Sequence, residues 1–450
     1  MINEAAAIAP DRRRGSATGE SSVGSRSTAG FGRADIVTAA ALCVAAFAVY
    51  APLALRLAEG RYLDYFNLAF DFDPFRTVQT LALSPPDLQG FKHPLIVLLR
   101  PLAWLLVSFG LEPKPAAALE MVAFGSGTVA VCFLFLRVAG AARAEAAALT
   151  LLFALTGTQI YTSIIVESYG FSGFAIALIW LAALRRLNDP DRWRGMRLVA
   201  AVLTFGVTIT NVVQPFIAEL LVSWRHGGWT RAIRQTAGFA LLLGAVGGLL
   251  AIAVWREHLW AAVLDPVSSL KEIWWLQTKG ETTGLLKVLQ TFFGYSFVTP
   301  HFSWLMLPEG INMRDFRDWS FSPVGSIAAP MWLLFWGAGA LAASRQPSYR
   351  WIALGLAAST IFNVLFHLNF QFRGSIFIYA AHLHFAIFAL GAGLAPWMAS
   401  RPMRMRIAYI GVVVALACLV GANNLSGVTG FVTDFDLVNT PCPAPCANGM

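Results

Sequence analysis

The stretch IVTAAALCVAAFAVYAPLAL, residues 36–55, contains twenty residues without a charged side chain. As a helix rising 1.5 Å per residue, it reaches about 30 Å, the thickness of the hydrocarbon core of a bilayer. Inside a bilayer every backbone N–H and C=O must be paired within the protein, which favours helices over open sheets. We therefore predict that residues 36–55 form a membrane-spanning helix.

Apolar runs of similar length recur along the chain. Hydrophobic residues make up 57% of the 450 residues and charged residues 13%, whereas soluble proteins carry roughly 25% charged residues. We predict an all-α, polytopic membrane protein with about eleven transmembrane helices, a re-entrant or juxtamembrane segment and an outer amphipathic segment. The runs lie near residues 36–55, 94–110, 117–136, 144–165, 170–184, 198–223, 236–254, 326–344, 351–368, 376–398 and 407–421.

The net charge of +8 lies largely in short loops between the apolar runs. This placement is typical of topology signals rather than of nucleic-acid binding, so we expect no nucleic-acid partner. Because Lys and Arg favour the cytoplasmic side of a membrane, the charges place the amino terminus in the cytoplasm and the carboxyl tail outside.

Two of the runs satisfy this charge rule only if they are not ordinary spans. The run 94–110 is interrupted by Arg100-Pro101, and proline breaks the hydrogen-bond ladder of a helix, so we predict a re-entrant or interfacial segment. The run 198–223 carries polar residues and a proline between 211 and 215. We predict two shorter helices hinged there.

These assignments divide the chain into a leader, a membrane domain and a tail. Residues 1–34 are predicted to be a disordered cytoplasmic leader, because they are rich in Ser, Gly and Arg. Residues 35–421 form a single transmembrane domain with two outer segments, 56–116 and 255–325. Residues 422–450 form an outer tail.

The motifs of several enzyme classes are missing from the sequence. It contains no Walker loop, no G-x-G-x-x-G after a strand and no HExxH, so ATP-driven transport, dinucleotide chemistry and zincin proteolysis have no support. Cys442 and Cys446 in the tail are spaced for a small disulfide loop, which requires a location outside the cytoplasm. Whether they pair is left open.

Three acidic residues are predicted to meet on the outer face. Asp71 and Asp73 lie one residue apart beside membrane-embedded sequence, so an extended or turn conformation puts them on one face. Such a carboxylate can act as a general base or bind a cation, although a solvated loop is an equal alternative. Glu167 lies in a very short turn between two apolar helices on the same face, and we expect it near the aspartates.

Polar residues also gather around the tenth crossing. Arg373 lies in the outer turn before it, where a guanidinium suits a lipid phosphate; the alternative is a snorkelling arginine. Tyr379 and His382 follow at i,i+3 and share a helix face. A buried histidine that is simply satisfied by its neighbours is the more common reading for His382.

The order of these motifs resembles the polytopic C-type glycosyltransferase superfamily, which includes protein O-mannosyltransferases and lipid A aminoarabinose transferases. The resemblance rests on Asp71-Phe72-Asp73, Lys92-His93-Pro94-Leu95, the basic turn Arg137–Arg143 and Glu167, and covers roughly residues 36–260. The sequence has one proline where many members have two, no adjacent acidic pair, and no large soluble outer domain.

The resemblance implies a membrane enzyme of the bacterial inner membrane and cell envelope. It would move a hexosyl or pentosyl group, with inversion, from a polyprenyl-phosphate donor to a hydroxyl of a lipid, glycan or protein, with its active site facing outside. The lipid-linked sugar serves as donor, and a divalent metal is left open. The implied site residues are Asp71, Asp73 and Glu167 for catalysis, Lys92, His93 and Arg373 for the donor phosphate, and Tyr169, Tyr379 and His382 for substrate contacts.

Two other functions are considered. A transporter or lipid flippase would use ionisable residues inside the membrane as coupling groups. A membrane O-acyltransferase would depend on an intramembrane histidine such as His382. The candidates for coupling groups are Glu120, Glu219, His382 and His384. The sequence does not specify the oligomeric state.

Overall fold

The computed structural model describes residues 31–65, 67–84, 93–264, 284–306, 312–369 and 375–437. Most of these residues are helical, which confirms the predicted all-α class. Within the described ranges the only strands are β1 (Ser303–Met306) and β2 (Asn312–Asp315), an antiparallel pair in which Ser303 lies opposite Asp315.

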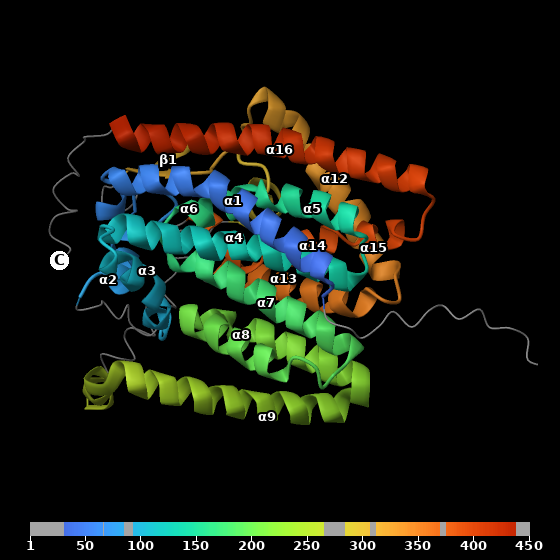
Figure 1. The fold of residues 1–450 in the computed structure, drawn as a ribbon, viewed down its shortest axis with the longest axis horizontal. Coiled ribbons are helices and arrows are strands. Elements are labelled where there is room, and N and C mark those ends of the chain that lie inside the picture. The colour runs from blue at the N-terminus through green and yellow to red at the C-terminus, as the bar shows by residue number, and fades with distance from the viewer. Residues whose placement is uncertain are drawn as a thin grey trace, which may run out of the picture. The chain divides into compact units, whose positions relative to one another are not determined.

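The first half of the chain forms long helices joined by short ones (Figure 1). In chain order they are α1 (Arg33–Glu59), η1 (Tyr62–Asp64), α2 (Pro74–Ala82), η2 (Ile96–Leu99), α3 (Pro101–Ser108), α4 (Pro113–Ala139), α5 (Arg143–Ala154), α6 (Gly157–Ile164), α7 (Ser168–Asn188), α8 (Arg194–Val207), η3 (Ile209–Val212) and α9 (Val213–Leu264).

The second half begins with short helical segments and the β-hairpin, followed by long helices. These elements are α11 (Leu285–Leu289), η4 (Gln290–Tyr295, a π-helix), α12 (Pro323–Arg345), α13 (Arg350–Asn369), η5 (Phe377–His382), α14 (His384–Gly391), α15 (Leu394–Met398) and α16 (Met403–Leu437). Helix α16 continues to Leu437, well beyond residue 421, where the last predicted apolar run ends.

Several helices are long and apolar enough to cross a membrane. Seven meet that description among the described residues, and eight if the bent pair α5 and α6 counts as one span. The protein is therefore a multi-pass membrane protein. The predicted number of about eleven requires three further crossings, by α8, by the second half of α9 and by α14–α15, and stays a prediction.

The two runs predicted to be irregular are irregular. Helix α3 has eight residues, about 12 Å of helix, and cannot cross a bilayer. Helix α8 ends at Val207 and α9 begins at Val213, which confirms the hinge. A straight helix of the 52 residues in α9 would be about 78 Å long, but Gly228 has φ +72°, so the helix is broken there.

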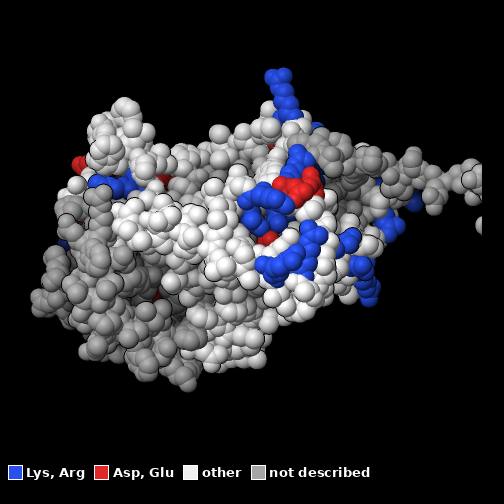
Figure 2. Space-filling model, turned by 90° about the horizontal axis from the view of Figure 1, so that it is seen from below, with Lys and Arg blue, Asp and Glu red and all other residues white. Residues whose placement is uncertain are grey.

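One end of the bundle is held together by buried and half-buried ion pairs of arginine. Asp35 accepts from Arg137 at 2.9 Å and from Arg143 at 3.2 Å, and Glu145 pairs with Arg406 at 2.6 Å. These contacts join the start of α1 to α4 and α5, and the start of α16 to α5. Figure 2 shows basic side chains gathered toward one end of a largely uncharged face. We call this end the arginine end.

The opposite end of the bundle carries the irregular elements. Figure 1 places α2, α3 and β1 there, on the left of the view. Lys114 at the start of α4 pairs with Asp64 at 2.6 Å, and Arg314 of β2 pairs with Asp434 of α16 at 2.5 Å. We call this the loop end, and those predicted site residues that the structure describes lie on it.

Candidate active site

The loop before α2 carries the two predicted aspartates on an unusual backbone. Asn67, Phe70 and Asp71 have φ values of 60°, 54° and 62°, in the left-handed region that bulky residues rarely adopt. Such strain costs on the order of 1–3 kcal/mol per residue and persists only where neighbouring structure holds it. Arg314 of β2 holds it here: its N–H donates to Leu68 O at 3.0 Å, and its carbonyl accepts from Phe70 N at 2.9 Å.

Phe70 also anchors the loop through its side chain. Its ring is fully buried, and its centroid lies 4.6 Å from that of Phe377 and 4.8 Å from that of Phe316. The next residue, Asp71, is half-buried, and its N–H lies 2.8 Å from the sulfur of Met313 in β2. The β-hairpin therefore sets the position of Asp71.

Glu167 lies between the starts of two helices and joins them. Its Oε2 accepts from the backbone N–H of Asp73 at 2.8 Å, and its Oε1 accepts from Ser168 N at 2.7 Å and from the Thr77 hydroxyl at 3.3 Å. Glu167 is buried. Burial, and secondly the nearby carboxylate of Asp73, raise the pKa of Glu167 to about 7. Glu167 therefore meets the loop at Asp73, as predicted, and its contacts suit it to position the loop.

Aromatic and histidine rings lie beside this acidic loop. Tyr169, in the first turn of α7, is within electrostatic range of Asp71, Asp73 and Glu167. Its ring centroid lies 5.3 Å from that of His382 and 6.2 Å from that of Tyr379. The three residues predicted to contact substrate are therefore together, next to the two aspartates.

His367 completes the ring cluster. It lies near the end of α13, and its ring stacks on Tyr379 at 4.3 Å and lies 5.9 Å from that of His382. The local sequence pattern did not identify His367. His367 could have been identified by the general rule that an ionisable residue inside a membrane-spanning helix is a candidate functional residue.

His382 is one of several buried polar side chains at this site with an atom that has no partner among the described residues. It is buried, and its Nε2 has no hydrogen-bond partner among the described residues. Its backbone carbonyl accepts from Gln214 Nε2 at 2.5 Å, and Gln214 is held in turn by Trp180 and Ser359 at 3.0 and 2.9 Å. Because a buried polar atom is costly when unpaired, His382 Nε2 is suited to bind a substrate atom.

His93 reaches the same region from the segment before α3. Its Nδ1 lies 2.5 Å from the carbonyl of Val207, the last residue of α8. A carbonyl can only accept, so Nδ1 carries the proton in this contact. His93 also lies within electrostatic range of His382. Lys92 and Arg373, predicted to bind phosphate with it, lie outside the described residues, as do Cys442 and Cys446.

A fourth acidic residue, Asp315, lies in the β-hairpin that supports the loop. Asp315 of β2 is buried; it accepts from the Ser375 hydroxyl at 3.2 Å and pairs with Arg317 at 3.0 Å. Burial raises the pKa of Asp315 to about 6, although Arg317 and other partners oppose the shift. Ser375 lies just before η5, so this contact fixes the hairpin against the segment that carries Tyr379 and His382. The sequence did not predict it.

Not every acidic residue considered for function lies at this site. Glu219 is buried in α9 at the arginine end, where it pairs with Arg186 and Arg197, each at 2.5 Å. His384 makes a 2.8 Å hydrogen bond with Thr156. Within the described residues, no group of three or more His, Cys, Asp or Glu is arranged to hold a metal ion.

Fold and site together define a multi-pass helical membrane protein with an acidic and histidine-rich site at one end of its bundle. No protein-family model and no curated protein matches the chain.

Solved structures give a low likeness. The chain is similar to the oligosaccharyltransferase of Archaeoglobus fulgidus in its apo form, with 12% identity, a TM-score of 0.46 and coverage of 88% of this chain. It is similar at 13% identity and a TM-score of 0.46, over 89% of this chain, to the archaeal oligosaccharyltransferase AglB from the same organism in complex with an inhibitory peptide and a dolichol-phosphate. The chain spans 56% of the length of both proteins. A likeness of this size does not define a family.

Proposed function

We propose that the protein is a membrane glycosyltransferase that moves a sugar from a polyprenyl-phosphate donor to a hydroxyl acceptor. The observation that carries the proposal is the meeting of Asp71 and Asp73 with Tyr169, Tyr379 and His382 at the loop end. This arrangement combines a carboxylate that can accept a proton, rings that can contact a sugar, and nitrogen donors for a phosphate.

Asp71 is our candidate for the general base. Of the two aspartates, it has the stronger electrostatic interaction with Tyr169, and it lies on the strained part of the loop. Asp73 precedes α2, where the helix dipole favours a charged carboxylate that is a weaker base. In the proposed reaction, the acceptor hydroxyl attacks the anomeric carbon, Asp71 takes its proton, and the bond from that carbon to the phosphate oxygen breaks with inversion.

The phosphate leaves with the bonding electron pair, so donors must stabilise its charge. His382 is the first described candidate, because its Nε2 has no partner within the described residues. His93 is the second: its Nδ1 proton goes to Val207, so it would donate to the phosphate from Nε2 as an imidazolium. Lys92 and Arg373 stay in the proposal on the basis of the sequence. Glu167 holds the loop that carries both aspartates.

The charge distribution supports an outward-facing site. Among the described residues, more ion-paired arginines lie at the arginine end than at the loop end, where Arg314 and Arg317 are paired, and positive charge favours the cytoplasmic side. We therefore propose that the loop end faces outside, with the amino terminus in the cytoplasm, in a bacterial inner membrane.

Transport is the weaker alternative. Of its four candidate coupling groups, Glu219 is held by two arginines and His384 bonds Thr156. Glu120 is buried with one carboxylate oxygen unpaired among the described residues, and His382 belongs to the loop-end ring cluster. An acyltransferase dependent on His382 is the third candidate. Incubation of membranes that contain the protein with radiolabelled polyprenyl-phosphate sugars separates these functions. We expect label in a hydroxyl acceptor; uptake of label without transfer, or transfer from an acyl donor alone, would overturn the proposal.

A further inference from the structure

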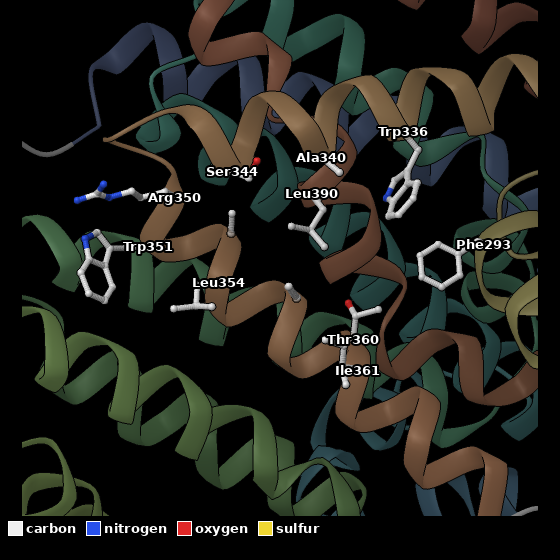
Figure 3. A pocket seen from close by; sticks show the side chains of 12 residues that line it. Phe293, Trp336, Ala340, Ser344, Arg350, Trp351, Leu354, Thr360, Ile361 and Leu390 are labelled. Atoms are coloured by element: carbon white, nitrogen blue, oxygen red, sulfur yellow. The ribbon is translucent and has the colours of Figure 1, made fainter. Parts of the chain in front are cut away.

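Away from the loop end, the helices α12, α13 and α14 enclose an apolar groove of about 630 Å³ (Figure 3). Its volume is within the range of about 300–1,000 Å³ of small-molecule sites. Small side chains of Ala340, Ala353 and Ala357 line it, with Trp336 and Phe293 toward one end. On the outer edge, Leu354 and Ile361 are exposed, so in a membrane the groove opens toward the lipid.

Three polar side chains in the middle of the groove already have partners. The Thr360 hydroxyl donates to Leu356 O at 2.9 Å, the Ser344 hydroxyl to Leu341 O at 2.9 Å, and Trp336 Nε1 to Ile387 O at 3.0 Å. The interior therefore offers no hydrogen bonds to a polar ligand. It suits a hydrocarbon chain, which gains only packing contacts.

Among the described residues that line the groove, positive charge lies at one end. Arg350, the first residue of α13, lines the groove, and Arg345, the last residue of α12, precedes it across a short turn. Both are exposed, and among the described residues neither pairs with a carboxylate. Arg225 lies nearby, with its guanidinium 5.7 Å from the ring centroid of Trp351. Tyr349 fixes the turn through a 2.8 Å hydrogen bond to Ala389 O.

We infer that this groove binds one acyl chain of an anionic phospholipid, with its phosphate at Arg345 and Arg350. An apolar channel with cations at a single end matches an amphiphile with one anionic head. The end lined by Phe293 and Trp336 contains no cation among the lining residues. A polyprenyl phosphate whose phosphate is bound at the loop end would place its apolar tail, not its phosphate, at the end of the groove that carries the arginines.

The lipid site is separate from the proposed active site. Arg350 and His367 are at opposite ends of α13, and seventeen residues of helix extend about 26 Å. The headgroup therefore lies in the leaflet at the arginine end. The bound lipid fills the space between α12 and α13 and stabilises them.

Lipid retention in native mass spectrometry tests this inference. The full chain is equilibrated with equal amounts of phosphatidylglycerol and phosphatidylcholine, and the retained lipids are counted. We expect the protein to retain one molecule of phosphatidylglycerol in preference to phosphatidylcholine. Because each basic residue near a lipid surface contributes to anionic-lipid affinity, Arg350→Gln should lower the preference about five-fold, while the exposed control Arg404→Gln at the same end should not.

A second variant tests the groove itself. Ala357→Leu should reduce retention of both lipids, because it narrows the groove, and Arg350→Gln covers the case in which Ala357→Leu fails to fold. If Arg350→Gln keeps the wild-type preference for phosphatidylglycerol, the inference is wrong. It is also wrong if added polyprenyl phosphate displaces phosphatidylglycerol to the same extent from wild type and from Arg350→Gln.

Discussion

The backbone N–H of Asp73 donates to the carboxylate of Glu167 at 2.8 Å, across 94 positions of sequence. This single contact joins the acidic loop of the first outer segment to the start of α7. Because the other carboxylate oxygen accepts from Ser168, both oxygens of Glu167 are used to hold backbone. The position of Asp71 and Asp73 relative to Tyr169 depends on this joint.

Replacement of Glu167 by Gln should disturb the loop without disturbing α7. An amide has one acceptor oxygen, so Gln can keep the bond from Ser168 or the bond from Asp73, but not both. A buried donor left unpaired costs about 1–3 kcal/mol. We expect Glu167→Gln to lower kcat about 10-fold or more, while the exposed control Glu112→Gln retains wild-type rates. Equal kcat in the two variants would contradict the positioning role.

The raised pKa of Glu167 predicts a pH dependence of stability. In the folded protein this pKa is about 7, above the ordinary value of 4.5, so the folded state binds the extra proton. The contribution of Glu167 is therefore fully present below pH 4.5 and is lost as the pH rises through 7. It is on the order of 3 kcal/mol.

Denaturant unfolding in mixed micelles between pH 4.5 and 8 measures this effect. Asp315, with a pKa raised to about 6, contributes with the same sign. The test is thus the difference between wild type and Glu167→Gln, which cannot titrate. Parallel pH profiles for the two proteins would argue against the buried state of Glu167.

Loss of the His382 side chain should affect the chemical step. If its Nε2 binds the leaving phosphate, His382→Ala removes one donor to developing charge, which lowers kcat about 10²–10³-fold. The matched control is His301→Ala, since His301 is exposed at the same end. A change in stability with unchanged kcat would assign His382 a purely structural role.

Glu219 should behave as a structural residue. Its removal leaves Arg186 and Arg197 buried or half-buried without their anion, and breaking a buried pair in this way costs about 3–5 kcal/mol. We expect Glu219→Ala to unfold at markedly lower denaturant, whereas Asp191→Asn, in an exposed pair with Arg194, changes stability by less than about 1 kcal/mol. Full stability with lost activity would instead favour a coupling role in transport.

The sequence predicted the helices better than the site. Membrane helices follow from local hydropathy, and the interruption at Pro101 and the polar cluster from Asn211 to Pro215 are local signals, so α3 and the hinge before α9 were predicted correctly. Charge in loops was enough to place Glu167 at the same end as Asp71 and Asp73.

Contacts between distant segments were not predictable in the same way. The stacking of His367 on Tyr379 and the bond between Ser375 and Asp315 depend on how α13, η5 and the β-hairpin pack. No local pattern specifies that packing. The left-handed backbone at Phe70 is a further case, because nothing but its tertiary contacts stabilises it there.

The rate of sugar transfer in Asp71→Asn tests the central claim most directly. With purified protein, a polyprenyl-phosphate sugar and an acceptor, loss of a general base should lower kcat about 10²–10⁴-fold. The control Asp64→Asn, which removes an acid paired with Lys114 at the same end, should remain active. Wild-type rates in both Asp71→Asn and Asp73→Asn would contradict the account.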